Sequence, residues 1–170
     1  MSFLREGLEV FLRCLGSDFQ ETHQFLQGLP DGKSARLTGD TTDDGTLWTA
    51  HGTDAVFVFE CAGRGFLDGN TIICRVGLAP NVQPPFTGTA WRVADLPDLG
   101  THVTLQCQGT GGGPCAGGFL DGHTAVNDGS VGLANSTAQP FSGTHWELIV
   151  SPIGSESGGG DLGGIPHIDV

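Results

Sequence analysis

Two copies of a short polar motif hold the side chains best suited to chemistry in this sequence. Gly-Phe-Leu-Asp-Gly-Asn-Thr contains Asp68 and Asn70, and Gly-Phe-Leu-Asp-Gly-His-Thr contains Asp121 and His123. The carboxylates can accept hydrogen bonds from ligand hydroxyls, and the amide and imidazole can donate or accept them. Each aspartate also precedes a glycine, as in a turn between two strands. Ligand contact and turn formation both stay open, and one residue can serve both.

Three of the cysteines occupy matching positions and raise the question of a metal site. Cys14, Cys61 and Cys107 each end a stretch in which apolar residues alternate with others. Three converging thiolates would suit zinc or copper(I), whereas separate buried thiols behave as small apolar side chains. We favour the second interpretation and expect no metal and no cofactor. Cys74 and Cys115 have no counterparts, and they are either a local pair or free thiols.

No arrangement of residues indicates catalysis. The six histidines lack metal-ligand spacing, and no motif marks a nucleophile beside its base. Asp121 and His123 could form an acid–base couple, but Asn70 replaces that histidine in the other copy. The acidic segment 39–45 looks superficially like a calcium loop, yet His51 stands where a bidentate glutamate is needed. We expect a turn there and a non-catalytic protein, with an enzyme as an open alternative.

These motifs belong to three repeats of one plan. The two later copies continue with Val-Gly-Leu-Ala, at 76–79 and 131–134, and end in Gly-Thr-x-Trp at Trp91 and Trp146. A more divergent first copy ends in Gly-Thr-Leu-Trp at Trp48. With the alternating apolar stretch that opens each copy, this plan predicts four short strands per repeat. One repeat cannot bury its own apolar face, so three must pack together.

The repeats also predict the domain organisation. We expect a single domain over residues 1–153, with repeats at about 9–52, 53–99 and 100–150. Residues 154–170 are rich in glycine and serine and are predicted to form a flexible tail. Because each tryptophan has an equivalent in every repeat, we expect the tryptophans in the core and not at a sugar-stacking surface.

Composition narrows the classes of partner. The net charge is −12 with only 7 Lys and Arg, which argues against nucleic acid as a partner. No stretch is apolar for long enough to span a membrane. The first residues show no secretory signal, and the odd cysteine count favours a reducing compartment. We therefore expect a cytoplasmic protein or one that is secreted by an unconventional route.

The repeated order of motifs over residues 10–150 resembles the β-trefoil superfamily. Ricin-type lectin repeats follow Cys-Leu-Asp, Val-x-Leu and Gln-x-Trp, and fascin-like repeats follow Gly-x-Tyr-Leu, Val-x-Leu and Phe-x-Val. The order here, Val-x-Leu, Gly-Phe-Leu-Asp-Gly, Val-x-Leu and Gly-Thr-x-Trp, lies between the two. The resemblance implies an all-β fold of the β-trefoil type, with three pseudo-symmetric four-stranded repeats.

The resemblance also carries an expectation about function. In ricin-type lectins the aspartate of Cys-Leu-Asp accepts hydrogen bonds from sugar hydroxyls, which implies this role for Asp68 and Asp121, while the first repeat has Gln27. The sequence departs from that family where a stacking aromatic is required, because Ala79 and Ala134 stand there. The half-cystine pairs of that family are also absent.

We therefore expect a lectin-like protein that binds a glycan or glycoprotein through loops of the second and third repeats. The expected ligand-binding residues are Asp68, Asn70, Asn81, Asp121, His123 and Asn135. A protein-binding trefoil of the fascin or protease-inhibitor kind is the first alternative, and the missing aromatics favour it. A small-molecule biosynthetic enzyme on the same scaffold is the second, and a deep apolar cavity would favour it.

Overall fold

The protein is built from short strands and tight turns. The computed structural model describes residues 3–16, 25–97, 100–122, 128–138 and 142–152. The strands are β1 (Glu9–Cys14), β2 (Phe25–Gly28), β3 (Ala35–Thr38), β4 (Trp48–Thr53), β5 (Val56–Cys61), β6 (Gly65–Asn70), β7 (Arg75–Ala79), β8 (Trp91–Asp95), β9 (His102–Cys107), β10 (Phe119–Gly122), β11 (Val131–Ala134) and β12 (Trp146–Val150). Short 3₁₀ turns precede the fourth strand of each repeat: η1 (Asp44–Thr46), η2 (Thr87–Thr89) and η3 (Ser142–Thr144). The all-β prediction is confirmed.

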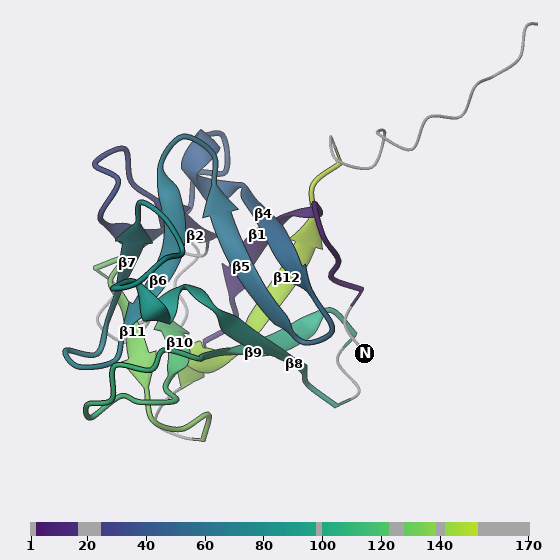
Figure 1. Cartoon of the computed structure of the whole chain (residues 1–170). Coiled ribbons are helices and arrows are strands. Elements are labelled where there is room, and N and C mark those ends of the chain that lie inside the picture. The colour runs from purple at the N-terminus through teal and green to yellow at the C-terminus, as the bar shows by residue number, and fades with distance from the viewer. Residues whose placement is uncertain (1–2, 17–24, 98–99, 123–127, 139–141, 153–170) are drawn as a thin grey trace, which may run out of the picture.

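The first and fourth strands of the repeats close into a ring. Antiparallel pairing runs from β1 to β4, β5, β8, β9 and β12 and returns to β1. The second and third strands form the hairpins β2–β3, β6–β7 and β10–β11. Figure 1 shows β6, β7, β10 and β11 gathered on one side of the molecule, beside the ring strands β1, β4, β5 and β12. Each repeat therefore supplies two ring strands and one hairpin.

The three tryptophans lie in the core, as predicted, and tie the ring to the hairpins. Each is fully buried, and each indole N–H donates to the carbonyl of the leucine in a Phe-Leu pair. The bonds are Trp48 Nε1 to Leu26 O at 3.0 Å, Trp91 Nε1 to Leu67 O at 3.0 Å, and Trp146 Nε1 to Leu120 O at 2.9 Å. A buried indole needs such an acceptor, so the same bond fixes the same geometry in every repeat.

A close contact between two backbones explains the Gly-Thr that precedes each tryptophan. A Cβ atom placed on Gly88 would lie 1.9 Å from the Gly69 carbonyl oxygen, and one on Gly143 would lie 1.9 Å from that of Gly122. In the first repeat, a Cβ on Gly45 would meet the carbonyl of the corresponding glycine of β2 at 2.2 Å. Only glycine permits each 3₁₀ turn to rest on the second strand of its own repeat.

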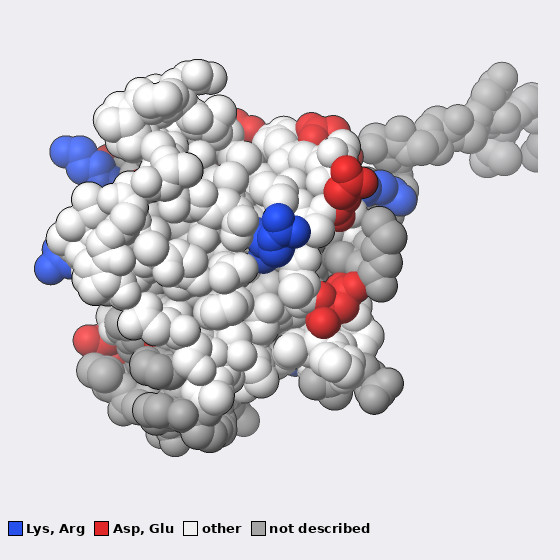
Figure 2. Space-filling model, turned by 60° about the horizontal axis from the view of Figure 1, so that its bottom comes forward, with Lys and Arg blue, Asp and Glu red and all other residues white. Residues whose placement is uncertain are grey.

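The surface carries few charges, as the composition requires. On the face shown in Figure 2, most of the area is uncharged, most of the acidic side chains lie toward one edge and the basic side chains are scattered. No helix among the described residues is long and apolar enough to cross a membrane. The predicted domain boundaries stay a prediction, and the predicted tail, residues 154–170, lies outside the described residues.

Candidate functional site

The second repeat holds a surface pocket between its hairpin and its 3₁₀ turn. The pocket has a volume of about 310 Å³. Its walls are Asp68 to Ile72 at the end of β6, Pro85 to Gly88 at the start of η2, and Gly111 from the third repeat. The pocket therefore lies where two repeats meet. It contains two of the residues predicted from the sequence, Asp68 and Asn70.

Asp68 forms part of the floor between hairpin and turn. Its carboxylate is half-buried, and this burial raises the pKa of Asp68, while the backbone N–H of Gly88 acts in the opposite direction. A Cβ atom on Gly88 would lie 2.9 Å from Asp68 Oδ1, so the turn reaches the carboxylate only because it has no side chain there. Asp68 thus supports the turn and also lines the pocket, while its contact with a ligand stays a prediction.

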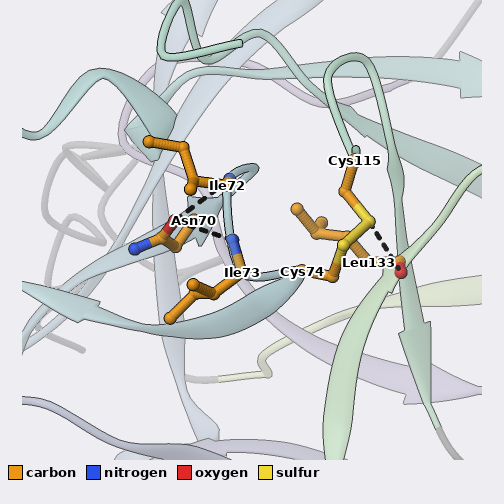
Figure 3. Close-up of a disulfide and its surroundings, with 6 residues drawn as sticks. All are labelled: Asn70, Ile72, Ile73, Cys74, Cys115 and Leu133. Atoms are coloured by element: carbon orange, nitrogen blue, oxygen red, sulfur yellow. Dashed lines mark hydrogen bonds between the residues drawn. A yellow bond between two sulfur atoms is a disulfide. The ribbon is translucent and has the colours of Figure 1, made fainter. Parts of the chain in front are cut away.

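Asn70 shapes the rim of the pocket. Its Oδ1 accepts hydrogen bonds from the backbone N–H groups of Ile72 at 3.2 Å and Ile73 at 3.3 Å, which holds the turn between β6 and β7 (Figure 3). Asn70 is exposed, and its amide nitrogen donates to no other described residue. The same turn leaves both isoleucines exposed, at 59% and 56% of their full surface. Polar and apolar groups are therefore adjacent at this edge.

A disulfide holds the opposite wall. Cys74, which ends this turn, is bonded to Cys115, with the two Cα atoms 5.4 Å apart (Figure 3). The backbone N–H of Cys115 also donates to Thr71 O at 3.0 Å. The glycine-rich segment 109–114, which includes Gly111, is thereby fastened to the pocket. The sequence left the pairing of these cysteines open, and the structure pairs them.

Phe86 is the pocket residue that sequence reasoning missed. The expected stacking position falls on Ala79, which is buried and pairs with Phe66 across the hairpin. Phe86 instead enters from the segment before η2 and is half-buried in the pocket wall. The available signal was Pro-Phe-Ser/Thr-Gly-Thr, which occurs in two repeats and places Phe141 at the equivalent position, outside the described residues.

In the first repeat an arginine fills the corresponding position. Arg64, from the β5–β6 turn, donates through the same nitrogen to Gly28 O at 2.6 Å and to Asp43 Oδ1 at 2.6 Å. Asp43 Oδ1 also accepts the N–H of Gly45 at 2.8 Å. The segment predicted to be a simple turn is held by these bonds. Gln27, which replaces the aspartate here, accepts from Arg36 Nε at 2.9 Å. The position that forms an open pocket in the second repeat is therefore filled by Arg64 in the first repeat.

The remaining predicted ligand residues are dispersed. Asp121 is buried, with 8% of its surface exposed, and His123 lies outside the described residues. Asn81 is exposed, and its Oδ1 accepts the backbone N–H of Gln83 at 2.9 Å. Asn135 is exposed just after β11. Of the six predicted residues, the pocket therefore brings together two, and the role of all six in binding stays a prediction.

The three matching cysteines do not converge. Each thiol lies between two repeats: Cys61 Sγ donates to Gly45 O at 3.6 Å, Cys107 Sγ to Gly88 O at 3.6 Å and Cys14 Sγ to Gly143 O at 3.5 Å. Burial raises the pKa of Cys14 to about 11. Within the described ranges, no three His, Cys, Asp or Glu side chains could together hold a metal ion. These thiols pack as small apolar groups.

Comparison with known proteins gives a fold resemblance only. No family model and no curated protein sequence matches the chain. Its structure is similar to that of SeviL bound to asialo-GM1 saccharide, with a TM-score of 0.60 and 13% identity, over 84% of this chain and 97% of that chain. It is also similar to GlcNAcα1-4Gal releasing endo-β-galactosidase from Clostridium perfringens, with a TM-score of 0.62 and 11% identity. That match covers 85% of this chain but 32% of the other.

Proposed function

We propose that this protein is a lectin-like β-trefoil that binds glycans, without catalysis, through the open pocket of its second repeat. One observation carries the proposal: a carboxylate, a primary amide and a phenyl ring, from Asp68, Asn70 and Phe86, line a single surface pocket of about 310 Å³. The pocket has room for a single sugar ring. The closed position at Arg64 argues against an equivalent site in the first repeat.

The chemistry of the pocket suits a sugar. A pyranose ring offers hydroxyl groups around its edge and C–H groups on its faces, so its binding site combines hydrogen-bonding groups with an apolar surface. Asp68 would accept from hydroxyl groups, and the amide nitrogen of Asn70 and the hydroxyl of Thr87 would donate to oxygen atoms of the sugar. Phe86 and Ile72 would contact the C–H faces. Contacts of this kind on an open surface give modest affinity.

The structural similarities support the same proposal. One similar protein is bound to a saccharide, and this chain matches nearly all of it; the other, of which 32% is matched, releases GlcNAcα1-4Gal. Since fold alone does not set function, the pocket and not the fold must carry the argument.

The test is a glycan array probed with the wild-type protein and with variants of the pocket. Asp68→Asn keeps the size of the side chain and an acceptor for Gly88, and Phe86→Ala removes the ring; we expect both to lose most of the binding. Gln83→Ala, which changes an exposed polar residue of the same repeat that does not line the pocket, is the control and should bind as the wild type does. A folded wild-type protein that binds no glycan would refute the proposal.

A protein-binding surface is the second candidate, and the exposure of Ile72 and Ile73 favours it. The discriminating variant is Ile72→Ser with Ile73→Ser, which removes the apolar rim and leaves the polar groups of the pocket. A glycan-binding protein should retain its preferred glycan class in this variant, with weaker affinity.

The expected place of action, in the cytoplasm or outside the cell after unconventional export, stays a proposal. The oxidation state of Cys74 and Cys115 in protein from its native source distinguishes the two.

A further inference from the structure

A second pocket adjoins the first across a shared wall. Its volume is about 370 Å³, and it lies between the β2–β3 turn of the first repeat and strand β7 of the second. Asp68 and Asn70 line both pockets. Ile72 lines the first pocket and Ile73 the second, so this turn separates them. A ligand of two or more sugar units could therefore occupy both.

Contacts between the two backbones fix the position of the second pocket. Ser34 pairs with Gly77 in an isolated β-bridge, and the N–H of Leu78 donates to Lys33 O at 2.8 Å. A Cβ atom on Gly77 would lie 2.4 Å from Lys33 O, so the two repeats approach as closely as a glycine allows. The turn that carries Lys33 and the strand that carries Arg75 are thereby held against each other.

Two basic side chains line this pocket in a strongly acidic protein. Lys33 and Arg75 are both exposed, and they belong to a set of only 7 Lys and Arg against 19 Asp and Glu. Within the part of the chain that the structure describes, neither makes an ion pair, whereas Arg13 is paired with Glu147 and Arg64 with Asp43.

The carboxylate of Asp31, the nearest acidic residue in the β2–β3 turn, is already hydrogen-bonded to groups of that turn. Asp31 accepts from the backbone N–H groups of Lys33 and Ser34, each at 2.8 Å, and from the Ser34 hydroxyl at 2.6 Å. Its charge reduces the positive potential near Lys33 without forming an ion pair with the ammonium group. Among the described residues, Asp68 is the only acidic one that lines the pocket, and it belongs to the wall shared with the first pocket.

We propose that the second pocket is a subsite for an acidic sugar, a unit carrying a carboxylate or a sulfate group, joined to a neutral sugar in the first pocket. The guanidinium group of Arg75 can bind either anion through two parallel N–H donors, and Lys33 adds a second positive charge. Asp68 would face hydroxyl groups at the junction of the two units. This inference rests on the proposed glycan-binding function and specifies its ligand class.

The test is an array of matched glycans in which the same galactose-terminated core is printed neutral, sulfated and sialylated. We expect the wild-type protein to bind the sulfated or the sialylated form, or both, about tenfold more tightly than the neutral form. The comparison between the two acidic forms shows which anion the subsite takes. Raising the salt concentration should reduce the preference.

The decisive variant is Lys33→Gln with Arg75→Gln. Both side chains are exposed, so the fold should be retained, which circular dichroism would verify. We expect the variant to bind acidic and neutral forms equally, with its affinity for the neutral form within twofold of the wild type. Arg92→Gln removes an exposed arginine that lines neither pocket, and it should keep the full preference. Equal wild-type binding of all three forms, or a preference that survives in the double variant, would overturn the subsite but not the lectin. Binding to none of the glycans would overturn both.

Discussion

The guanidinium group of Arg64 donates to the carboxylate of Asp43 at 2.6 Å across the boundary between the first and second repeats. The hydrogen bond from Arg64 holds the pKa of Asp43 well below its usual range. A carboxyl group whose pKa is lower in the folded state adds stability above its unfolded pKa of about 4, and this stability is lost as the pH falls through the folded value. The pair thus contributes to stability at neutral pH but not in strong acid.

We therefore predict that Arg64→Gln is destabilising at pH 7 and much less so near pH 2. Urea unfolding of the wild-type protein and the variant at both pH values measures the difference. Glycan binding by the second repeat should stay within twofold of the wild type, because Arg64 does not line that pocket. An equal loss of stability at both pH values would show that the arginine acts through its packing or its bond to Gly28 O, and not through the charge of Asp43.

A histidine bridge near the N-terminus gives a different pH dependence. His51 Nδ1 lies 2.8 Å from Glu6 Oε1, and His51 Nε2 lies 2.8 Å from Glu60 Oε2. Hydrogen bonding to Glu6 raises the pKa of His51 and lowers the pKa of Glu6. The contribution of the histidine is complete below its unfolded pKa of about 6.5 and is lost as the pH rises through its higher folded value. That of Glu6 is complete above about 4.3 and is lost as the pH falls.

Accordingly, His51→Gln should be most destabilising between about pH 4.5 and 6.5 and less so at pH 8.5. The difference in urea midpoint between wild type and variant, followed across this range, measures the effect. His102→Gln is the control, because His102 makes no ion pair with any described residue. A His51 effect that does not change with pH would contradict the bridge.

The sequence was sufficient to predict the all-β scaffold because the same pattern of residues occurs three times along the chain. Trp48, Trp91 and Trp146 mark the same point of three repeats, and each makes the same indole-to-carbonyl bond. Apolar alternation around such fixed points leaves little freedom in strand pairing. The fold class could therefore be predicted from this sequence without comparison to any homologous protein.

The candidate site was only partly predictable, because its walls come from loops that do not repeat. Asp68 and Asn70 were found because they lie within a repeated motif. Gly111 reaches the pocket from an insertion in another repeat, and Arg64 closes the first-repeat position from the repeat that follows it. No periodicity connects such residues to their partners. Only the docking of one repeat on the next brings them together.

The disulfide between Cys74 and Cys115 predicts that the unreduced protein has three free thiols. Unfolded, unreduced protein should react with a thiol reagent at the three remaining cysteines, Cys14, Cys61 and Cys107, and folded protein should react far less because these are buried. Replacing the pair by serines should lower the free energy of unfolding by about 2–4 kcal/mol. It should also weaken glycan binding, because the glycine-rich wall is no longer fastened. Five reactive thiols in unreduced, unfolded protein would refute the bond.

The contact between the η2 turn and β6 predicts a large difference between two glycine substitutions. A Cβ atom at position 88 would lie 1.9 Å from Gly69 O. Because Gly69 adjoins Asp68 and the η2 turn leads directly into Trp91, we expect a shift of either backbone to displace one of these residues. We expect Gly88→Ala to cost roughly 3 kcal/mol or more of stability, at the upper end of the range for overpacking. Gly111→Ala, in the same pocket, would place its Cβ 3.7 Å from Thr71 Oγ1, an ordinary contact, and should change stability by less than about 1 kcal/mol. Thermal and urea unfolding of the two variants provide the comparison. Similar stability in both would mean that the turn does not rest on the strand, and the pocket between them would then have a different shape.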